Sequence, residues 1–359
     1  MLAHWHNAAK LSTSQLLLLT TDYLPTLLSP LTFLLFFLFA HHFALFTFYF
    51  MNLYALRQNC SQQYDILLSV PKKSLKDYLE FVKFEHTIFA LPFAYTAMLL
   101  AKNSWPGWQV FIWITIAMIG ARTASMALNR VIDAKIDAKN PRTQNREIPA
   151  GTLNKYDGII LAIIGFALLI VAGWQLNRLT LFLLPIAVFF LSFYPYTKRF
   201  TWLCHYWLGL TIGASAAGGW IAVTGSFAPA AIALWIAVAL WIAGFDIIYA
   251  LLDYDFDIAN SIHSVPAKFG IKNALIISAI SHVLAVIALL ASCYYSDSSG
   301  TYAISWRFYT LAIAVVAGVL VYVHWLVNKK GAANALKSFN ANMFISPIIL
   351  ISVILDLVL

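Results

Sequence analysis

The sequence predicts an all-α integral membrane protein with nine transmembrane helices. Of its 359 residues, 61% are hydrophobic and only 11% are Asp, Glu, Lys or Arg. Soluble domains are about 45–50% apolar and about 25% charged. Many apolar segments approach or reach the roughly 20 residues that a helix needs to cross a bilayer. These segments are continuous and do not alternate with polar residues, which favours helices over barrel strands.

The nine predicted spans follow one another through residues 71–359. They cover residues 79–101, 108–130, 157–174, 179–196, 203–224, 228–252, 273–292, 307–327 and 342–358. No Pro-rich or Ser-rich linker interrupts this part of the chain. Residues 71–359 are therefore predicted to form one domain.

The connections between these spans alternate between basic and nearly uncharged. Basic residues precede the first span and follow the second, fourth, sixth and eighth: Lys72, Lys73, Lys76, Arg130, Lys135, Lys139, Arg142, Arg146, Lys155, Lys198, Arg199, Lys268, Lys272, Lys329, Lys330 and Lys337. The opposite connections contain only Lys102, Arg178 and Arg307. Because basic loops stay in the cytoplasm, these connections are predicted to face it and the C-terminus to point outward. The net charge of +8 then needs no nucleic-acid partner.

Residues 1–70 contain one further apolar stretch, at 24–50, followed by the polar segment RQNCSQQYD. Three interpretations remain open: a tenth span, a signal anchor, or translated sequence upstream of the true start. Met51 is an alternative initiator for the third. A cleavable signal peptide is disfavoured, because the stretch is too long and begins too late. We expect residues 1–70 to be an extension that is dispensable for chemistry.

A concentration of charge follows the second span. The segment NRVIDAKIDAKNPRT, at 129–143, contains two Asp, two Lys and two Arg in a chain that is otherwise poor in charge. Asn129, Asp133 and Asp137 stand at positions i, i+4 and i+8. They lie along one face if the second span continues as a helix.

A second acidic segment, DIIYALLDYDFD at 246–257, begins within the sixth span and continues past its end. Its Asp246, Asp253 and Asp257 share a face within roughly 40° if the helix is continuous. Asp133 and Asp137 precede Asp253 and Asp257 by 120 positions, which is compatible with an internal duplication. The chain is therefore expected to present two matched acidic faces.

These acidic faces predict a magnesium site. Carboxylates in or near a membrane are costly and indicate function, although loop carboxylates wetted by the cytoplasm are the simpler alternative. Clustered carboxylates repel one another unless a cation lies between them. Mg²⁺ is bound by a few carboxylate oxygens together with substrate phosphate oxygens. It then neutralises a pyrophosphate leaving group.

Basic side chains on the same predicted side could hold the phosphate oxygens. They are Arg142, Arg146, Lys198, Arg199 and Lys268. The positive-inside bias would by itself place some of them there. Tyr194 stands near Lys198 and is a further candidate for substrate contact. Arg122 lies seven residues before Asn129, inside the second span, and there it needs an Asp or an anionic substrate as a partner.

Other polar residues receive simpler interpretations. His205 is predicted to lie at the membrane interface near a helix start. Asp255 lies off the shared acidic face and is predicted to be solvated or to support the other acids. Cys60, Cys204 and Cys293 are widely spaced and predict neither a disulfide framework nor a metal site.

Several segments together resemble the UbiA family of intramembrane aromatic prenyltransferases. They are N-x-x-x-D-x-x-x-D at 129–137, the following NPRTQNREIPAG and D-x-x-x-D at 253–257. KFEHTIFALPFAY (83–95), FYPYTKRFT (193–201) and SVPAKFG (264–270) extend the resemblance over residues 75–359. Within the family, the chain is most similar to the 4-hydroxybenzoate polyprenyltransferase branch.

This resemblance implies nine helices around a central cavity that opens sideways to lipid. It implies that Mg²⁺ and diphosphate are held by Asn129, Asp133, Asp137, Asp253 and Asp257, with the four Asp as catalytic residues. The substrates would be a polyprenyl diphosphate and an aromatic acid, 4-hydroxybenzoate, in ubiquinone or menaquinone synthesis. The protein would lie in the bacterial inner (plasma) membrane, with its active site facing the cytoplasm.

Two departures leave the acceptor open. Leu252 and Ile258 stand where related members often have Gln and Arg. The acceptor could instead be a naphthoate, homogentisate or haem, and the sequence determines neither prenyl chain length nor oligomeric state. An alternative from another class is a secondary transporter whose intramembrane acids carry a proton or a metal ion. The position of the acids at helix ends, beside basic residues, favours the enzyme.

Overall fold

The computed structural model describes residues 73–83, 87, 89–298 and 307–359, and this part of the chain contains helices but no strands. The helices are α2 (Leu75–Phe81), α3 (Leu91–Lys102), α4 (Trp108–Asp137), α5 (Lys155–Leu176), α6 (Arg178–Thr197), α7 (Cys204–Thr224), α8 (Pro229–Tyr249), η3 (Ala250–Asp253), α9 (Tyr254–Ala259), α10 (Val265–Ser298), α11 (Arg307–Lys330), η4 (Ala332–Asn334), α12 (Ala335–Asn342) and α13 (Ile345–Val358). The predicted extension, residues 1–70, lies outside the described residues.

Eight helical segments among the described residues are long and apolar enough to cross a membrane. They confirm the predicted all-α membrane fold and correspond to the predicted spans from 108–130 onward. The first predicted span, 79–101, is divided between α2 and α3. With 12 residues and a rise of about 1.5 Å per residue, α3 is shorter than the hydrocarbon core of roughly 30 Å. The predicted count of nine spans is therefore not confirmed.

Two local features interrupt the first predicted span. Lys83 has a φ of 48°, a left-handed conformation that ends helical winding after α2. Pro92 occupies the first turn of α3. Because proline lacks a backbone N–H and clashes with the carbonyl four residues earlier, a helix begins at it more readily than it runs through it. Apolar composition alone does not detect either interruption.

Small residues allow the helices to pack closely. A Cβ atom on Gly165 of α5 would lie 2.5 Å from the backbone nitrogen of Ala124 in α4. A Cβ atom on Gly209 of α7 would lie 2.1 Å from the carbonyl oxygen of Ala239 in α8. Such close backbone approach provides the van der Waals contact that holds helices together in lipid. In the apolar part of the span that includes α8, 72% of the residues are buried inside the protein, compared with 11% for α6. Helix α8 is therefore central and α6 faces outward.

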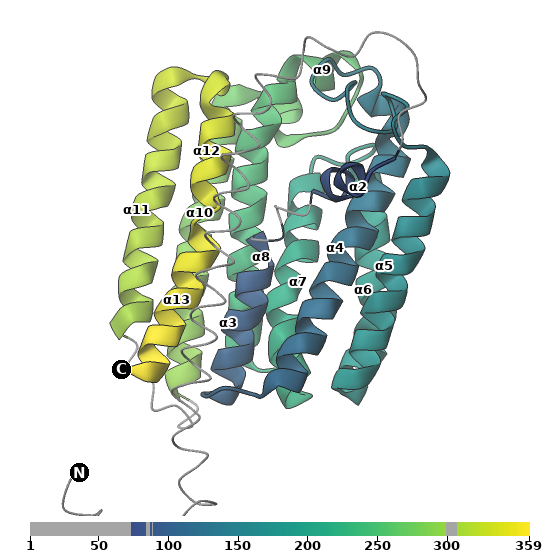
Figure 1. Ribbon diagram of the computed structural model, residues 1–359. Helices are drawn as coiled ribbons and strands as arrows, with labels where there is room; N and C mark the ends of the chain where they lie inside the picture. Colours follow the sequence, from purple (N-terminus) through teal and green to yellow (C-terminus); the bar gives the residue numbers. More distant parts are fainter. Residues whose placement is uncertain (1–72, 84–86, 88, 299–306) are drawn as a thin grey trace, which may run out of the picture. The chain divides into compact units, whose positions relative to one another are not determined.

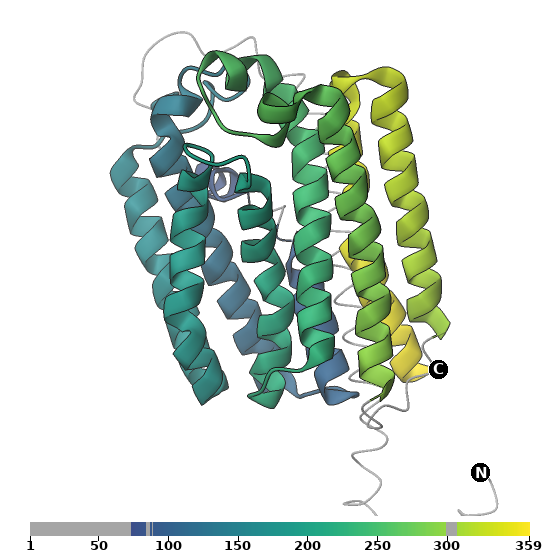
Figure 2. The ribbon, with the colours of Figure 1, turned by 180° about the vertical axis from the view of Figure 1, so that it is seen from behind.

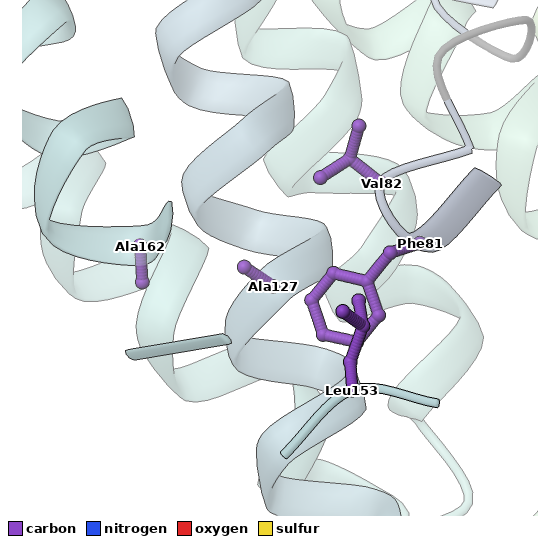
Figure 3. Packing of buried hydrophobic residues seen from close by; sticks show 5 residues of the cluster. All are labelled: Phe81, Val82, Ala127, Leu153 and Ala162. Atoms are coloured by element: carbon purple, nitrogen blue, oxygen red, sulfur yellow. The ribbon is translucent and has the colours of Figure 1, made fainter. Parts of the chain in front are cut away.

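The segment that follows the first acidic motif and the helix that carries the end of the second lie at one end of the bundle. Figures 1 and 2 both place α9 and the α4–α5 connection at that end. Helix α2 packs against α4 and α5 through a small apolar cluster that contains Phe81, Val82, Ala127, Leu153 and Ala162 (Figure 3). This packing holds α2 beside the part of α4 that leads to the first motif.

Candidate functional site

A cavity of about 510 Å³ lies between the helices and is lined mainly by α4, α6, α7 and α8, with further residues from α3, α5 and α12. The predicted central cavity is therefore present. Most of its wall is apolar, but five predicted site residues contribute to it: Arg122, Asn129, Arg146, Tyr194 and Asp246.

The first acidic motif lies on a continuous helix, as predicted. Helix α4 continues to Asp137, so Asn129, Asp133 and Asp137 share one face. The Asp133 side chain is 1% exposed and accepts hydrogen bonds from Lys198 Nζ at 2.6 Å and Arg199 Nη2 at 2.9 Å. Asn129 Nδ2 donates a third bond to it at 3.2 Å. Two cations from the end of α6 therefore balance this buried carboxylate.

Asp137 is the last residue of the same helix, and in the described part of the chain one of its carboxylate oxygens remains free to accept a bond. Its Oδ1 accepts a hydrogen bond from Arg146 Nη1 at 2.8 Å, and its backbone carbonyl accepts one from the Thr143 hydroxyl at 3.1 Å. Its Oδ2 is buried without a hydrogen-bond partner among the described residues. A buried carboxylate oxygen left in this state is a candidate ligand for a cation.

The second motif does not lie on one continuous helix, contrary to the expectation from its spacing. Helix α8 ends at Tyr249, and the chain continues through the 3₁₀ helix η3 before α9 begins at Tyr254. A 3₁₀ helix has three residues per turn. The change in winding removes the simple shared face expected for Asp246, Asp253 and Asp257.

The connection after the first motif holds Asp253. Arg142 donates to both carboxylate oxygens of Asp253, through Nε at 2.8 Å and through Nη2. Asn140 Nδ2 donates to Asp253 Oδ1 at 2.8 Å, and Arg142 Nη1 donates to the Tyr249 hydroxyl at 2.9 Å. Burial alone would lower the pKa of Arg142, but its contacts with Asp253 and Tyr249 raise the pKa overall. A charged arginine from the connection after the first motif thus holds the carboxylate of the second motif.

Asp257 and Lys268 have different surroundings. Asp257 is 7% exposed and accepts a hydrogen bond from the Ser264 hydroxyl at 2.8 Å. The Lys268 ammonium lies 5.1 Å from the centre of the Trp202 ring and 5.3 Å from that of Phe269. The structure therefore brings four of the five predicted bases to the acidic motifs and places Lys268 against aromatic rings.

The donor set fits a magnesium ion that is bound together with a diphosphate. Within the described part of the chain, no three His, Cys, Asp or Glu side chains are grouped closely enough to hold a metal by themselves. Mg²⁺ commonly uses one or two protein carboxylates and takes its other ligands from phosphate and water. The unpartnered Asp137 Oδ2 matches that pattern.

Two arginines of α4 reach the cavity wall, and sequence reasoning identified only one of them. Arg122 Nη2 donates to the carbonyl oxygen of Lys83 at 3.2 Å. Arg130 is 3% exposed, and its Nε donates to the carbonyl oxygen of Phe81 at 3.4 Å. Its Nη1 is buried without a hydrogen-bond partner among the described residues. The only sequence signal for this role is its position one residue after Asn129, and its charge alone places it with the basic connection.

Sequence reasoning also missed Tyr249 and His205. Tyr249 lines the cavity and contacts Arg142, and no residue pattern distinguished it from the other tyrosines. His205 is the second residue of α7, near a helix start as expected, but its side chain is buried in the protein at 3% exposure. Its Nδ1 lies 2.7 Å from Asp246 Oδ2. This partner is 41 residues away in sequence, so local context could not indicate it.

Residues 90–348 match the sequence model of the UbiA prenyltransferase family. A protein named 4-hydroxybenzoate octaprenyltransferase from Aliivibrio fischeri (strain ATCC 700601 / ES114) is 30% identical over 262 residues, which cover 72% of this chain and 87% of that protein. A protein of the same name from Janthinobacterium sp. (strain Marseille) is 29% identical over 269 residues, covering 73% and 90%.

Solved structures show the same fold. The apo structure of a UbiA homologue from Aeropyrum pernix K1 matches with a TM-score of 0.68 and 33% identity, over 76% of this chain and 98% of that one. A UbiA homologue from Archaeoglobus fulgidus, bound to GPP and Mg²⁺, matches with a TM-score of 0.60 over 79% of this chain and 100% of that one. Its identity is 15%, so this similarity supports the fold alone.

Proposed function

The chain belongs to the UbiA prenyltransferase family and is an integral membrane prenyltransferase; on this basis we propose that it transfers a polyprenyl group from a polyprenyl diphosphate to 4-hydroxybenzoate, in the synthesis of ubiquinone or menaquinone. One observation carries the proposal: the cavity wall combines Asn129 and Arg146 of the acid- and base-rich end with a large apolar surface. The charged end suits a diphosphate, and the apolar wall suits a prenyl chain.

In this proposal, the two acidic motifs would hold Mg²⁺ together with the diphosphate. The residues that would hold it are Asn129, Asp133, Asp137, Asp253 and Asp257. The unpartnered oxygen of Asp137 supports this assignment. When bound, the metal supplies positive charge that neutralises the departing diphosphate.

The basic residues then exchange partners when the donor binds. Arg142, Arg146, Lys198 and Arg199 are paired with Asp253, Asp137 and Asp133 in the structure. Diphosphate oxygens are alternative acceptors for the same N–H groups. Once these groups bind diphosphate, the carboxylates lose their partners and would be the residues that hold the cation. The ion pairs therefore keep the site preorganised and its charge balanced.

Prenyl transfer follows from this arrangement. The bond between C1 of the donor and its diphosphate oxygen breaks, and both electrons leave with the diphosphate. The ring carbon ortho to the acceptor hydroxyl attacks C1, and the ring loses a proton. Arg122 binds the acceptor carboxylate, Tyr194 contacts the substrates, and the apolar cavity keeps water from the allylic cation.

The proposed location follows from charge. The α4–α5 connection, which carries Arg142 and Arg146, and α9, which carries Asp257, lie at one end of the bundle (Figure 1). Basic connections remain in the cytoplasm, so we infer that the active site faces the cytoplasm. The named relatives are bacterial, which supports the bacterial inner membrane as the location.

A membrane-fraction assay with one labelled prenyl diphosphate tests the acceptor. The acceptors are 4-hydroxybenzoate, a hydroxynaphthoate, homogentisate and haem, and membranes without the protein are the control. We expect a labelled product with 4-hydroxybenzoate. A product with haem or the naphthoate alone would reassign the acceptor within the same chemistry. Membership of a prenyltransferase family supports the enzyme over the transporter, and absence of product with every acceptor would contradict it.

A further inference from the structure

His205 and Asp246 form a pair that the mechanism above does not use. Helices α7 and α8 bring His205 Nδ1 to 2.7 Å from Asp246 Oδ2. The His205 side chain is 4% exposed, whereas the Asp246 side chain is 26% exposed. Asp246 also lines the cavity. The pair therefore extends from the protein interior to the cavity surface.

The contacts of His205 indicate which ring nitrogen carries its proton. The backbone N–H of Val265 donates to His205 Nε2 at 3.2 Å, so Nε2 is the unprotonated acceptor. The proton of a neutral imidazole then lies on Nδ1 and is donated to Asp246 Oδ2. A carboxylate that accepts this bond is oriented by it.

The second oxygen of Asp246 is available to a substrate. Among the described residues, Asp246 Oδ1 has no hydrogen-bond partner, and the carboxylate has no Lys or Arg within ion-pair distance. Asp133 and Asp253, by contrast, are paired with Lys198 and Arg142. A base needs a lone pair that no cation already occupies, and Asp246 meets this condition at the cavity wall.

We propose that Asp246 is the base that accepts the hydroxyl proton of the aromatic acceptor, and that His205 is the positioning residue that orients it. The inference rests on the proposed function, because it requires an acceptor ring with a hydroxyl group. Arg122 lines the same cavity. The same cavity wall thus contains a cation suited to a carboxylate and a base suited to a hydroxyl group.

The proton transfer makes the ring nucleophilic. The hydroxyl O–H bond breaks, its proton goes to Asp246 Oδ1, and its electron pair moves through the oxygen into the ring. The ortho carbon then forms the bond to C1 of the donor while the C1–O bond breaks and diphosphate leaves. The substituted carbon loses its ring proton to a diphosphate oxygen, and protonated Asp246 returns its proton to the phenolate oxygen.

The test uses three variants of the full chain in membranes. Asp246→Asn removes the base, and His205→Phe keeps the ring but removes the donor. His205→Asn restores an N–H group that can reach Asp246. Asp255→Asn is the matched control, because Asp255 is an exposed acid of the same segment. The rate, kcat, is measured at saturating donor with 4-hydroxybenzoate and with 3-fluoro-4-hydroxybenzoate, whose hydroxyl is more acidic, and is normalised to protein abundance.

A general base contributes about 10²–10⁴-fold to a rate, so Asp246→Asn should lower kcat with 4-hydroxybenzoate by about 100-fold or more. The more acidic acceptor needs less help from a base. The ratio of wild-type to Asp246→Asn rates should therefore be several-fold smaller with it. His205→Phe should show the same dependence on the acceptor to a lesser degree, and His205→Asn should recover most of the loss.

Equal rate ratios with the two acceptors would overturn the inference, because a merely structural loss does not depend on acceptor acidity. A wild-type rate in Asp246→Asn would overturn it as well. If Asp246→Asn fails to accumulate, the two His205 variants test the inference. Equal kcat values for His205→Phe and His205→Asn would then contradict the role proposed for the His205–Asp246 pair. If the wild-type protein transfers no prenyl group, the proposed function is overturned. If the wild-type protein turns over normally and Asp246→Asn is unaffected, only this inference is overturned.

Discussion

Asp133 and Asp253 should act as parts of one diphosphate clamp. Asp133 accepts bonds from Lys198 and Arg199, and Asp253 is held by Arg142. The changes to test are Asp133→Asn, Asp253→Asn and the double variant. Each single change removes negative charge from the groups proposed to hold the Mg²⁺ that neutralises the departing diphosphate in the transition state. Each should lower kcat by roughly a hundredfold or more, about 2.7 kcal/mol.

The structure also sets the expected cost in stability. Removing one partner of a buried ion pair costs about 3–5 kcal/mol. The side chains of Lys198 and Arg199 remain 28% and 31% exposed, so water solvates them when Asp133 loses its charge. The cost of Asp133→Asn in stability should therefore lie at or below the lower end of that range. Asn keeps the shape of the side chain, and we expect the variant to insert and fold.

The measurement is the initial rate at saturating substrates for both single variants and the double variant, normalised to protein in the membrane. The double variant should be little slower than either single variant, because groups that act as a unit are not additive. Asp255→Asn, a neighbouring exposed acid, is the control and should keep its rate. A near-wild-type rate in either single variant would refute the shared clamp, and multiplicative losses would indicate two separate sites.

Three further predictions follow from the same structure. EDTA should abolish prenyl transfer by washed membranes and added Mg²⁺ should restore it, since the motifs are proposed to need a cation; full activity in EDTA would contradict the metal assignment. Arg122→Ala should raise KM for 4-hydroxybenzoate without changing KM for the donor; an equal rise in both would exclude a specific carboxylate contact. Gly219→Ala should lower the Tm in detergent, because its Cβ would lie 2.2 Å from the Ala94 carbonyl oxygen and overpacking costs about 1–3 kcal/mol. Gly218→Ala, where a Cβ meets nothing within 4 Å, is its control, and equal Tm values would contradict the packing.

Much of the site was predictable because it is local in sequence. The spacing of Asn129, Asp133 and Asp137 requires only that α4 continue to Asp137, which it does. The charge of Arg142 and its place after this motif were likewise visible. Its partner was not, because Asp253 is 111 residues away and no local pattern identifies a contact between distant segments.

The second motif shows where periodicity fails. The expected shared face assumed 3.6 residues per turn through Asp257, but the chain leaves α8 at Tyr249 for a 3₁₀ helix. The interruption of the first predicted span at Lys83 and Pro92 is a similar case. A hydropathy pattern reports which residues avoid water, and a short break in helical winding hardly changes it.

The sequence by itself determined the membrane class, the alternation of basic and uncharged connections and the two acidic motifs. These features depend on composition and near-neighbour spacing, which the bilayer and helical geometry translate directly into structure. The tertiary structure decided the pairing of each carboxylate, the burial of His205 against Asp246 and the exposure of Asp246 to the cavity. These depend on which helices lie side by side, and that is set by close packing at residues such as Gly209 and Ala239, which no single segment specifies.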